Sequence, residues 1–564
     1  MIIAGFLEAL GVGVIVPFIG LIMNPESIHE NTILIYIYNS FSFENNESFI
    51  LFFSLAIGLI FVFKNLFLIF FTKYQNDFLC KEQSRISTML FESYLAKPYV
   101  FHLSNNSSEL LRNIFMEVQK LFEYIIFPFF LILSETITVA LILAILLIIS
   151  PLVTLVSISV LALMVGVFFK LIQAKTKGFG LKQQYYSGEM LKWINQGFGI
   201  GKELKILGRE HFFKDKYFKS SNLYARYNSY SKLIVSIPRM YIETLVFLLI
   251  ITLVLLLSRN LSSQDFFPIL ALFAASAVRL MPSINRIISS INSIKYFSNS
   301  LDIVINDIQR AEINNGFIIE KTNCPTKLVL KKELKITLLK YSYPESEETI
   351  LDSINFGIKK GEIVGFAGTS GSGKTTLVDL IMGILDPTEG QIFIDGSPVS
   401  DNLRSWQANI GYVPQNIFLT DDTITNNVAF AINEKDISIE KVWDALDKAQ
   451  MKGFVKKLPQ GLDTIVGERG VRLSGGERQR IGIARALYHD PEILVFDEAT
   501  SALDNSTEKE VMKAIYGLRR DKTIILIAHR LSTLEDCDVI YEMKSGRIVN
   551  EIRKSQINKQ GEIQ

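Results

Sequence analysis

The sequence predicts a helical membrane domain followed by an α/β domain. Apolar runs of about 20 residues, long enough to cross a bilayer, occur through the first 290 positions and then stop. After a polar linker, short β-rich runs alternate with helical stretches, which is typical of an α/β domain with a largely parallel sheet. We place the membrane domain at residues 1–305, the linker at 306–335 and the α/β domain at 336–554.

Composition supports this division and excludes several classes of protein. Of the 564 residues 49% are hydrophobic and only 20% are charged, so part of the chain is built for a solvent other than water. The formal net charge of +1 provides no global field toward nucleic acid, and we expect no nucleic-acid partner. Three widely spaced cysteines, Cys80, Cys324 and Cys537, exclude a disulfide framework and a CxxC zinc site.

We count six membrane spans in the first part of the chain. A secretory signal in place of the first span is disfavoured, because that run contains Glu8 and lacks a positive start and a small-residue cleavage site. The run begins at Met1 without flanking residues, which leaves an upstream start open. Ser150-Pro151 separates the third span from the fourth. The six runs are Met1–Met23, Phe49–Phe71, Tyr124–Ile149, Leu152–Phe169, Tyr241–Leu257 and Phe266–Ile288.

Basic residues predict the orientation of these spans. Residues 24–48 hold four Glu and no Lys or Arg, whereas residues 72–120 and 170–232 are rich in Lys and Arg. By the positive-inside rule the two long connectors face the cytoplasm, and an even number of spans places the α/β domain there too. Connectors of about 50 and 60 residues are too long for plain loops, so we expect helical extensions of the spans.

The first functional motif in the second part of the chain is a candidate phosphate-binding loop. A β-rich run, Ile363–Ala367, leads into a GxxxxGKT motif that is followed by an apolar helix ending before Pro387. Glycines let consecutive backbone N–H groups and a helix N-terminus point at a polyphosphate, while the lysine reaches its β- and γ-phosphates and the next hydroxyl joins the Mg²⁺ shell. The candidate residues are Gly368, Thr369, Ser370, Gly371, Ser372, Gly373, Lys374, Thr375 and Thr376.

Two carboxylates follow a second buried strand. Ile493–Phe496 ends in Asp497-Glu498, and the carboxyl ends of strands face the crevice where α/β sheets bind ligands. We expect Asp497 to hold Mg²⁺ and Glu498 to polarise the attacking water. Alone this pattern equally fits a helix N-cap; together with the phosphate loop it indicates nucleotide hydrolysis.

Between these two motifs lies Leu473-Ser474-Gly475-Gly476-Glu477. This segment resembles the signature motif of ABC-transporter ATPases, in which Gln is usual where this chain has Glu477. Ser474 and Gly476 begin a helix, whose N-terminus forms an anion site. The resemblance implies that Ser474, Gly475, Gly476 and Glu477 complete the γ-phosphate pocket of the other subunit's nucleotide.

The resemblance extends to further positions of the α/β domain. It implies that Tyr343 stacks on adenine, with Tyr341 as the alternative, and that Gln415 senses Mg²⁺ and touches the membrane part. Ser501-Ala502-Leu503-Asp504 resembles the loop that crosses the dimer interface, and His529 the residue that contacts the γ-phosphate. Val466–Gly470 is typical of exporters, and the retained Glu498 implies active hydrolysis.

One set of spans with one ATPase domain resembles half of a transporter. In this family the phosphate loop and the signature motif occupy opposite faces, so one copy cannot close around its own ATP. We expect a homodimer, the commonest symmetric assembly, with a heterodimer as the alternative. The resemblance also implies a short coupling helix in each connector, near residues 97–103 and 203–210.

Charges within the spans bear on the substrate. Arg279 and Arg286 are seven residues apart, hence on one helix face, and guanidinium groups suit an anionic substrate group. The alternative is that Arg286 marks the cytoplasmic end of its helix. Arg239 and Glu243 are four residues apart and are expected to pair.

Three segments resemble bacterial flippases for lipid-linked oligosaccharides of protein N-glycosylation, the PglK type: residues 237–243, 279–288 and 300–303. This resemblance implies an inner-membrane flippase for a polyprenyl-pyrophosphate-linked oligosaccharide. Residues 32–43 could then lie in the membrane interface against the lipid tail, or form a packed outer turn. Export of another lipid such as lipid A, of a drug or of a peptide is the alternative; no peptidase-like domain precedes the spans, which disfavours the peptide.

Overall fold

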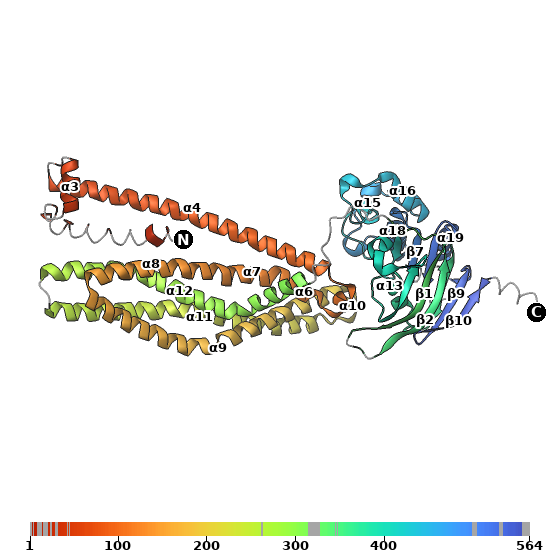
Figure 1. Ribbon diagram of the computed structural model, residues 1–564, viewed down its shortest axis with the longest axis horizontal. Coiled ribbons are helices and arrows are strands. Elements are labelled where there is room, and N and C mark those ends of the chain that lie inside the picture. Colours follow the sequence, from red (N-terminus) through yellow and green to blue (C-terminus); the bar gives the residue numbers. More distant parts are fainter. Residues whose placement is uncertain are drawn as a thin grey trace, which may run out of the picture. The chain divides into compact units, whose positions relative to one another are not determined.

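The computed structural model describes residues 32–41, 43, 45–260, 263–313, 327–344, 346, 348–498, 505–528 and 534–554, with scattered residues between 3 and 28. The chain divides into two compact units (Figure 1). The first comprises Met1–Lys97 and Phe101–Ile319, and the second comprises Pro98–Val100 and Glu320–Gln564. The main division between the units therefore falls inside the predicted linker.

Long helices build the first unit. They are α4 (Asn46–Leu95), α8 (Phe127–Ile149), α9 (Pro151–Gly199), α11 (Glu210–Asn260) and α12 (Ser263–Ile313). α4 has 50 residues and is therefore about 75 Å long, more than twice the thickness of a hydrocarbon core. Apolar and connector sequences thus form continuous helices, as we expected. α8 ends at Ile149 and α9 starts with Pro151 at its first position, so the Ser150-Pro151 break lies where the sequence predicts it.

The shorter helices of this part of the chain are α3 (Thr32–Ser40), α5 (Tyr99–Ser104), α6 (Ser107–Arg112), α7 (Val118–Leu121) and α10 (Gly201–Leu207); the first two residues of α5 belong to the second unit. α5 and α10 overlap the two segments, 97–103 and 203–210, for which coupling helices are expected. Two π-helical turns, η1 (Asn113–Glu117) and η2 (Phe122–Ile126), flank α7.

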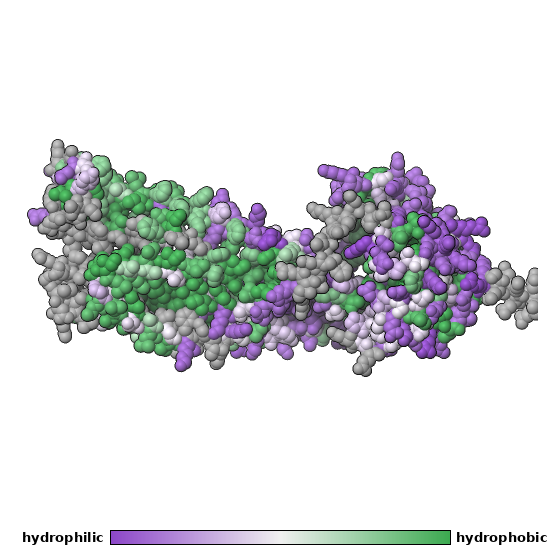
Figure 2. Space-filling view, in the orientation of Figure 1, coloured by the Kyte–Doolittle hydropathy of each residue, from purple (hydrophilic) through white to green (hydrophobic). Residues whose placement is uncertain are grey.

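Among the described residues, three helices are long and apolar enough to cross a membrane. They are Asn46–Leu95, Ser107–Ile149 and Glu210–Thr252, with a shorter apolar helix at Pro151–Met164. Large apolar side chains lie exposed along α4, among them Leu55, Leu59 and Phe63, and Figure 2 shows hydrophobic surface over much of the visible face of this unit. Such a surface suits lipid contact. The predicted first span, Met1–Met23, lies mostly outside the described residues.

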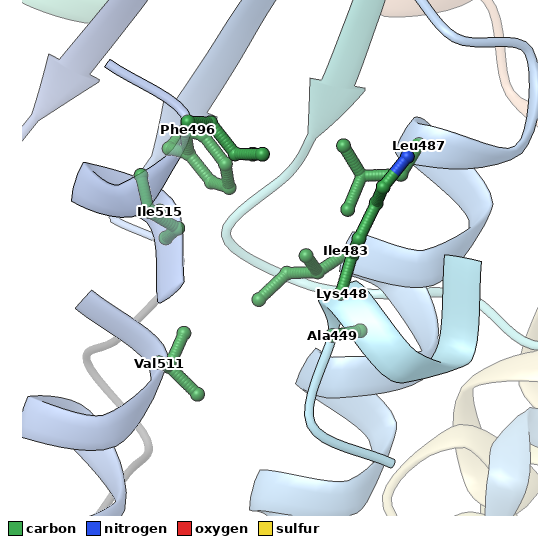
Figure 3. A pocket seen from close by; sticks show the side chains of 8 residues that line it. Lys448, Ala449, Ile483, Leu487, Phe496, Val511 and Ile515 are labelled. Atoms are coloured by element: carbon green, nitrogen blue, oxygen red, sulfur yellow. The ribbon is translucent and has the colours of Figure 1, made fainter. Parts of the chain in front are cut away.

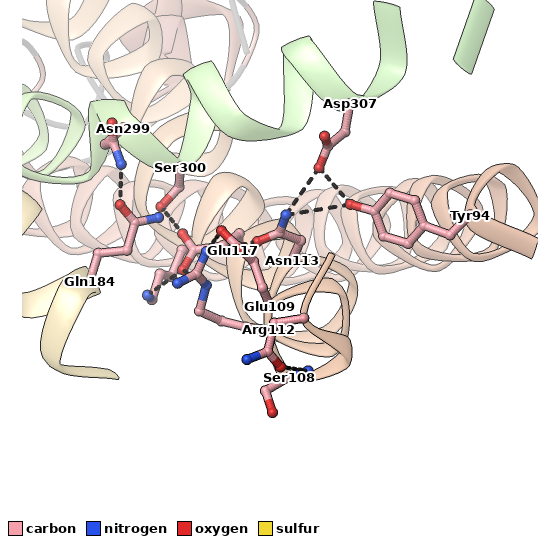
Figure 4. Close-up of polar contacts among 12 residues, drawn as sticks. Tyr94, Ser108, Glu109, Arg112, Asn113, Glu117, Gln184, Asn299, Ser300 and Asp307 are labelled. Atoms are coloured by element: carbon pink, nitrogen blue, oxygen red, sulfur yellow. Dashed lines mark hydrogen bonds and ion pairs between the residues drawn. The ribbon is translucent and has the colours of Figure 1, made fainter. Parts of the chain in front are cut away.

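A buried polar cluster ties together α12, α4 and the π-helical region of the first unit (Figure 4). Glu117 is fully buried; it accepts hydrogen bonds from Lys120 at 3.0 Å and from Ser300 at 2.5 Å. Asp307 accepts from the Tyr94 hydroxyl at 2.5 Å and from the Asn113 amide at 3.1 Å. Asn113 and Glu117 are the first and last residues of η1, and both are buried.

Two sheets form the second unit. The larger has the order β10-β9-β3-β8-β7-β6, in which all neighbours are parallel except β10 and β9. The smaller is antiparallel, with the order β2-β1-β4-β5. The predicted α/β domain with a largely parallel sheet is confirmed. Strand bounds are β1 Glu333–Ser342, β2 Thr349–Lys359, β3 Ile363–Gly368, β4 Glu389–Ile394, β5 Ser397–Pro398, β6 Ile410–Val413, β7 Ile493–Asp497, β8 Thr523–Ile527, β9 Val539–Lys544 and β10 Arg547–Arg553.

Helices pack against these sheets through two apolar cores. Their bounds are α13 Lys374–Ile381, α14 Leu403–Gln407, α15 Ile424–Val428, α16 Ile439–Lys448, α17 Lys452–Lys457, α18 Gly475–Tyr488 and α19 Asn505–Gly517. Trp406 is fully buried and donates from its indole nitrogen to the carbonyl of Ile381 at 2.7 Å, which anchors the C-terminal end of α13. A small pocket between α16, α18, β7 and α19 is lined by apolar side chains such as Phe496 and by Lys448 (Figure 3).

Candidate functional site

The predicted phosphate loop connects β3 to α13. β3 is buried almost throughout, and three glycines of the loop have positive φ: Gly368 (153°), Gly371 (78°) and Gly373 (97°). A side chain at Gly368 would meet the Met543 carbonyl oxygen at 2.3 Å, whereas one at Gly371 would meet nothing within 4 Å. The loop is therefore tightly packed where it leaves the strand and open at its crest, as a cradle for an anion requires.

Lys374 is the first residue of α13 and lies folded back over the loop. Its ammonium donates to the carbonyls of Gly368 at 2.9 Å and Thr369 at 3.0 Å. Burial lowers the pKa of Lys374, while the charges of Glu498 and Asp497 oppose that shift. The lysine thus shares one electrostatic environment with both predicted carboxylates.

The carboxylates stand at the end of β7, whose five residues are all buried. Asp497 is 6% exposed, and Glu498 follows with a positive φ of 49° and a backbone N–H that donates to the Ile527 carbonyl at 3.1 Å. The Gln415 amide donates to the Glu498 carboxylate at 2.7 Å. The fold therefore brings Gln415, which follows β6, into direct contact with the residue predicted to polarise water.

Sequence reasoning missed Asp379. This residue lies on α13, where burial and the charge of Asp497 raise the pKa of its carboxyl to about 6. Its position is the signal that was available: an acidic residue five positions after Lys374 in an otherwise apolar helix turn. A third carboxyl group thus borders the predicted metal site.

The two tyrosines proposed for adenine stacking differ in burial. Tyr341 lies in β1 and is 3% exposed, whereas Tyr343 follows the strand and is half-buried. Their rings pack edge to face with centroids 5.0 Å apart. Only Tyr343 keeps part of its ring accessible, which favours it over Tyr341.

The signature segment starts α18. Ser474 is the N-cap, and its hydroxyl accepts from the Glu477 backbone N–H at 3.3 Å. Glu477 in turn accepts from the Ser474 backbone N–H at 2.7 Å, which completes a capping box. This explains how the chain accommodates Glu where the family usually has Gln, because Glu is well suited to the third position of a helix. Gly475 and Gly476 form the half-buried first turn.

Several expected residues lie outside the part of the chain that the structure describes: His529, the segment 501–504 and Cys324. The two described cysteines are free thiols, Cys80 exposed and Cys537 buried.

In the membrane unit the structure pairs Arg286 with a carboxylate. Its guanidinium donates through Nη1 to Glu135 Oε1 of α8 at 2.5 Å. Arg279 lies two turns earlier on α12 and is half-buried. The expected ion pair between Arg239 and Glu243 is wrong: both side chains are exposed on α11, and the ion pairs among the described residues do not include it.

Both units match models of one family. Residues 27–278 match the ABC transporter transmembrane region, and residues 351–501 match the ABC transporter ATPase model. The chain belongs to the ABC transporter family and joins an exporter-type transmembrane domain to an ATPase domain.

Curated relatives include several ATP-dependent lipid A-core flippases. The chain is 30% identical to that of Hahella chejuensis over 477 residues, covering 82% of this chain and 78% of the relative. It is 32% identical to that of Francisella tularensis strain SCHU S4 over 415 residues (70% and 65%). It is 45% identical to that of Alkalilimnicola ehrlichii over 210 residues (37% and 36%). The match thus spans just under two thirds of the length of the Francisella relative and about a third of the length of the Alkalilimnicola relative.

A solved structure of a bacterial Atm1-family ABC exporter with ATP bound has the same fold, with a TM-score of 0.77 and 24% identity. The match covers 99% of this chain and 95% of that one. The predicted exporter-type membrane domain followed by an ABC ATPase domain is thereby confirmed.

Proposed function

We propose that two copies of this chain form an ATP-hydrolysing exporter that flips a saccharide lipid with an anionic headgroup across the bacterial inner membrane. The observation that carries the proposal is the grouping of Lys374, Asp497, Glu498 and Gln415 beyond the carboxyl ends of β3, β7 and β6 of one sheet. Membership of the ABC transporter family, which extends over both units, supports the coupling of hydrolysis to transport.

ATP fits the open crest of the phosphate loop. Ser372 contributes a buried hydroxyl oxygen that has no hydrogen-bond partner among the described residues, and the crest at Gly371 opens to free space. The backbone N–H groups of residues 368–376 and the Lys374 ammonium hold the phosphates, and Tyr343 stacks on the adenine. The family resemblance assigns contact with the γ-phosphate to His529.

Mg²⁺ fits the oxygen-rich border of this loop. Thr375, Asp497 and Gln415 provide the hydroxyl, carboxylate and amide oxygens that this hard cation prefers. When bound there, Mg²⁺ would supply positive charge that offsets the charge of the phosphates. Glu498, held by Gln415, orients and polarises the attacking water.

A homodimer completes the nucleotide site. The N-terminus of α18, with Ser474, Gly475, Gly476 and the capping residue Glu477, provides backbone donors and the positive end of a 14-residue helix. We assign this second anion site to the γ-phosphate of the partner copy's ATP. Each dimer then contains two sites, and each site needs both chains.

Two substrates share the chemistry that the membrane unit suits. Lipid A with its core and polyprenyl-pyrophosphate oligosaccharides both combine hydrocarbon tails, phosphate groups and sugars. The relatives named as lipid A-core flippases favour the first. The segment 279–288 resembles flippases for lipid-linked oligosaccharides, which favours the second. The phosphate groups of both lipids suit the guanidinium groups of Arg279 and Arg286. α3 packs Tyr38 against Phe49 and exposes Tyr36, so aromatic side chains are available to a lipid tail.

Reconstituted flipping tests the proposal. The full chain is placed in liposomes that contain either lipid A with its core or a fluorescent polyprenyl-pyrophosphate oligosaccharide, and ATP-dependent leaflet accessibility is measured. Glu498→Gln is the inactive control. Movement of one lipid by the wild type alone supports the function and selects the substrate, whereas ATP hydrolysis without movement of either lipid refutes the substrate class.

A further inference from the structure

A buried carboxylate of α8 faces the arginine of α12 that we assign to the substrate. The Glu135 side chain is 4% exposed and that of Arg286 is 46% exposed. A single contact joins them, from Nη1 to Oε1. Glu135 Oε2 is buried and has no hydrogen-bond partner among the described residues.

This geometry stabilises the fold poorly. A carboxylate buried beside a half-exposed arginine recovers its desolvation cost only when the geometry is good and its remaining lone pairs are satisfied, and here one carboxylate oxygen has no donor among the described residues. Charged groups within apolar helices are costly and normally face a cavity or a partner. A stabilising role therefore does not account for the Glu135 carboxylate.

The arrangement leaves most of the arginine available. Guanidinium has five N–H donors in a fixed plane, and the contact with Glu135 is made through the nitrogen Nη1, which carries two of them. The side chain is nearly half exposed, so the rest of this plane can meet a ligand. A carboxylate on one edge fixes the orientation of the plane and offsets its charge.

We propose that Glu135 is a positioning residue that orients Arg286 toward the phosphate of the substrate and moderates its attraction for that phosphate. This inference rests on the proposed flipping of an anionic saccharide lipid. A transporter must bind its substrate and also release it. Glu135 favours binding because it orients the guanidinium of Arg286 toward the phosphate. It favours release because its negative charge lowers the net positive charge that attracts the phosphate.

Two substitutions separate orientation from charge. Glu135→Gln keeps an oxygen that accepts from Arg286 and removes the negative charge, so the KM for a phosphorylated lipid falls by about three- to tenfold and the maximal rate falls with it. Glu135→Ala removes the anchor as well, so the KM rises by about threefold or more.

The experiment uses the full chain in lipid nanodiscs and measures ATPase activity against the concentration of two probes. These are lipid A with both phosphates and monophosphoryl lipid A; leaflet movement of the same lipids is followed in liposomes. Glu82→Gln is the matched control, because Glu82 also pairs with an arginine, Arg85, at 2.7 Å but on the exposed surface of α4. Each rate is divided by the rate of the same variant without added lipid.

Opposite KM shifts in the Gln and Ala variants, larger for the diphosphorylated lipid and absent from the control, are the expected result. Equal shifts in both Glu135 variants, or shifts that do not depend on the number of phosphates, overturn the inference and indicate a structural pair. Unchanged KM values in both variants also overturn it. If the wild type moves neither lipid, the proposed function itself fails, which is a distinct outcome.

Discussion

Replacing Glu498 with Gln tests the centre of the proposed mechanism. Gln has the same shape and can still accept a hydrogen bond from Gln415, which lies 2.7 Å from the carboxylate. The amide cannot act as a base, and a positioned base contributes about 10²–10⁴ in rate. At about 1.4 kcal/mol per tenfold, the activation free energy should rise by about 3–5 kcal/mol.

Folding and nucleotide binding should survive this change. Glu498 is half-buried, and an isosteric substitution there should alter the free energy of unfolding by less than about 0.5 kcal/mol, or about 1–2 °C in Tm for a domain of this size. Phosphate release gives the rate, and the rise in Tm on adding ATP reports binding. A variant that retains more than about a tenth of the wild-type rate would refute the assignment of Glu498; a variant that no longer responds to ATP would show that the substitution damages the site itself.

Three further substitutions test the ATPase domain. Trp406→Phe removes the donor to the Ile381 carbonyl and leaves a void of about 40 Å³, so the free energy of unfolding should fall by about 2–4 kcal/mol. The measurement is the loss of ATPase activity in urea, and a decrease below about 1 kcal/mol contradicts the prediction. Ser474→Ala removes the N-cap and should cost about 1 kcal/mol, whereas Glu477→Gln keeps the capping hydrogen bonds and should cost less than half of that; equal Tm losses would argue against the capping box. The folded pKa of Asp379, about 6, exceeds its ordinary value near 4, so this carboxyl stabilises the fold fully below about pH 4 and ceases to do so as the pH rises through 6. Asp379→Asn should therefore lessen the loss of Tm between pH 5 and pH 8, and an unchanged loss would mean that this carboxyl does not titrate there.

Local chemistry made much of this protein predictable. A proline after Ser150 ends one helix and starts another wherever it stands, and the break between α8 and α9 lies there. The glycines at 368, 371 and 373 specify backbone angles that other residues avoid, and all three have positive φ. The signature segment likewise predicts a helix start at Ser474, since Ser with Glu three residues later is a capping box in sequence.

Contacts between distant segments were not predictable in the same way. The sequence suggested a local ion pair of Arg239 with Glu243, but both side chains are exposed and do not form that pair. The sequence did not suggest the contact that Arg286 makes with Glu135, which lies 151 residues away. The helix period brings residues four apart onto one face; which neighbouring helix that face meets depends on packing.

The sequence by itself determined the class of protein, the order of its two parts and the residues able to hold a nucleotide, because strand, loop and helix starts depend on neighbours along the chain. Only the tertiary structure decided that Gln415 contacts Glu498 across 83 residues and that Asp379 is buried near Asp497. The physical reason is that contact across a parallel sheet depends on strand order and register. A carboxyl pKa depends in addition on how much water the packed fold leaves around it.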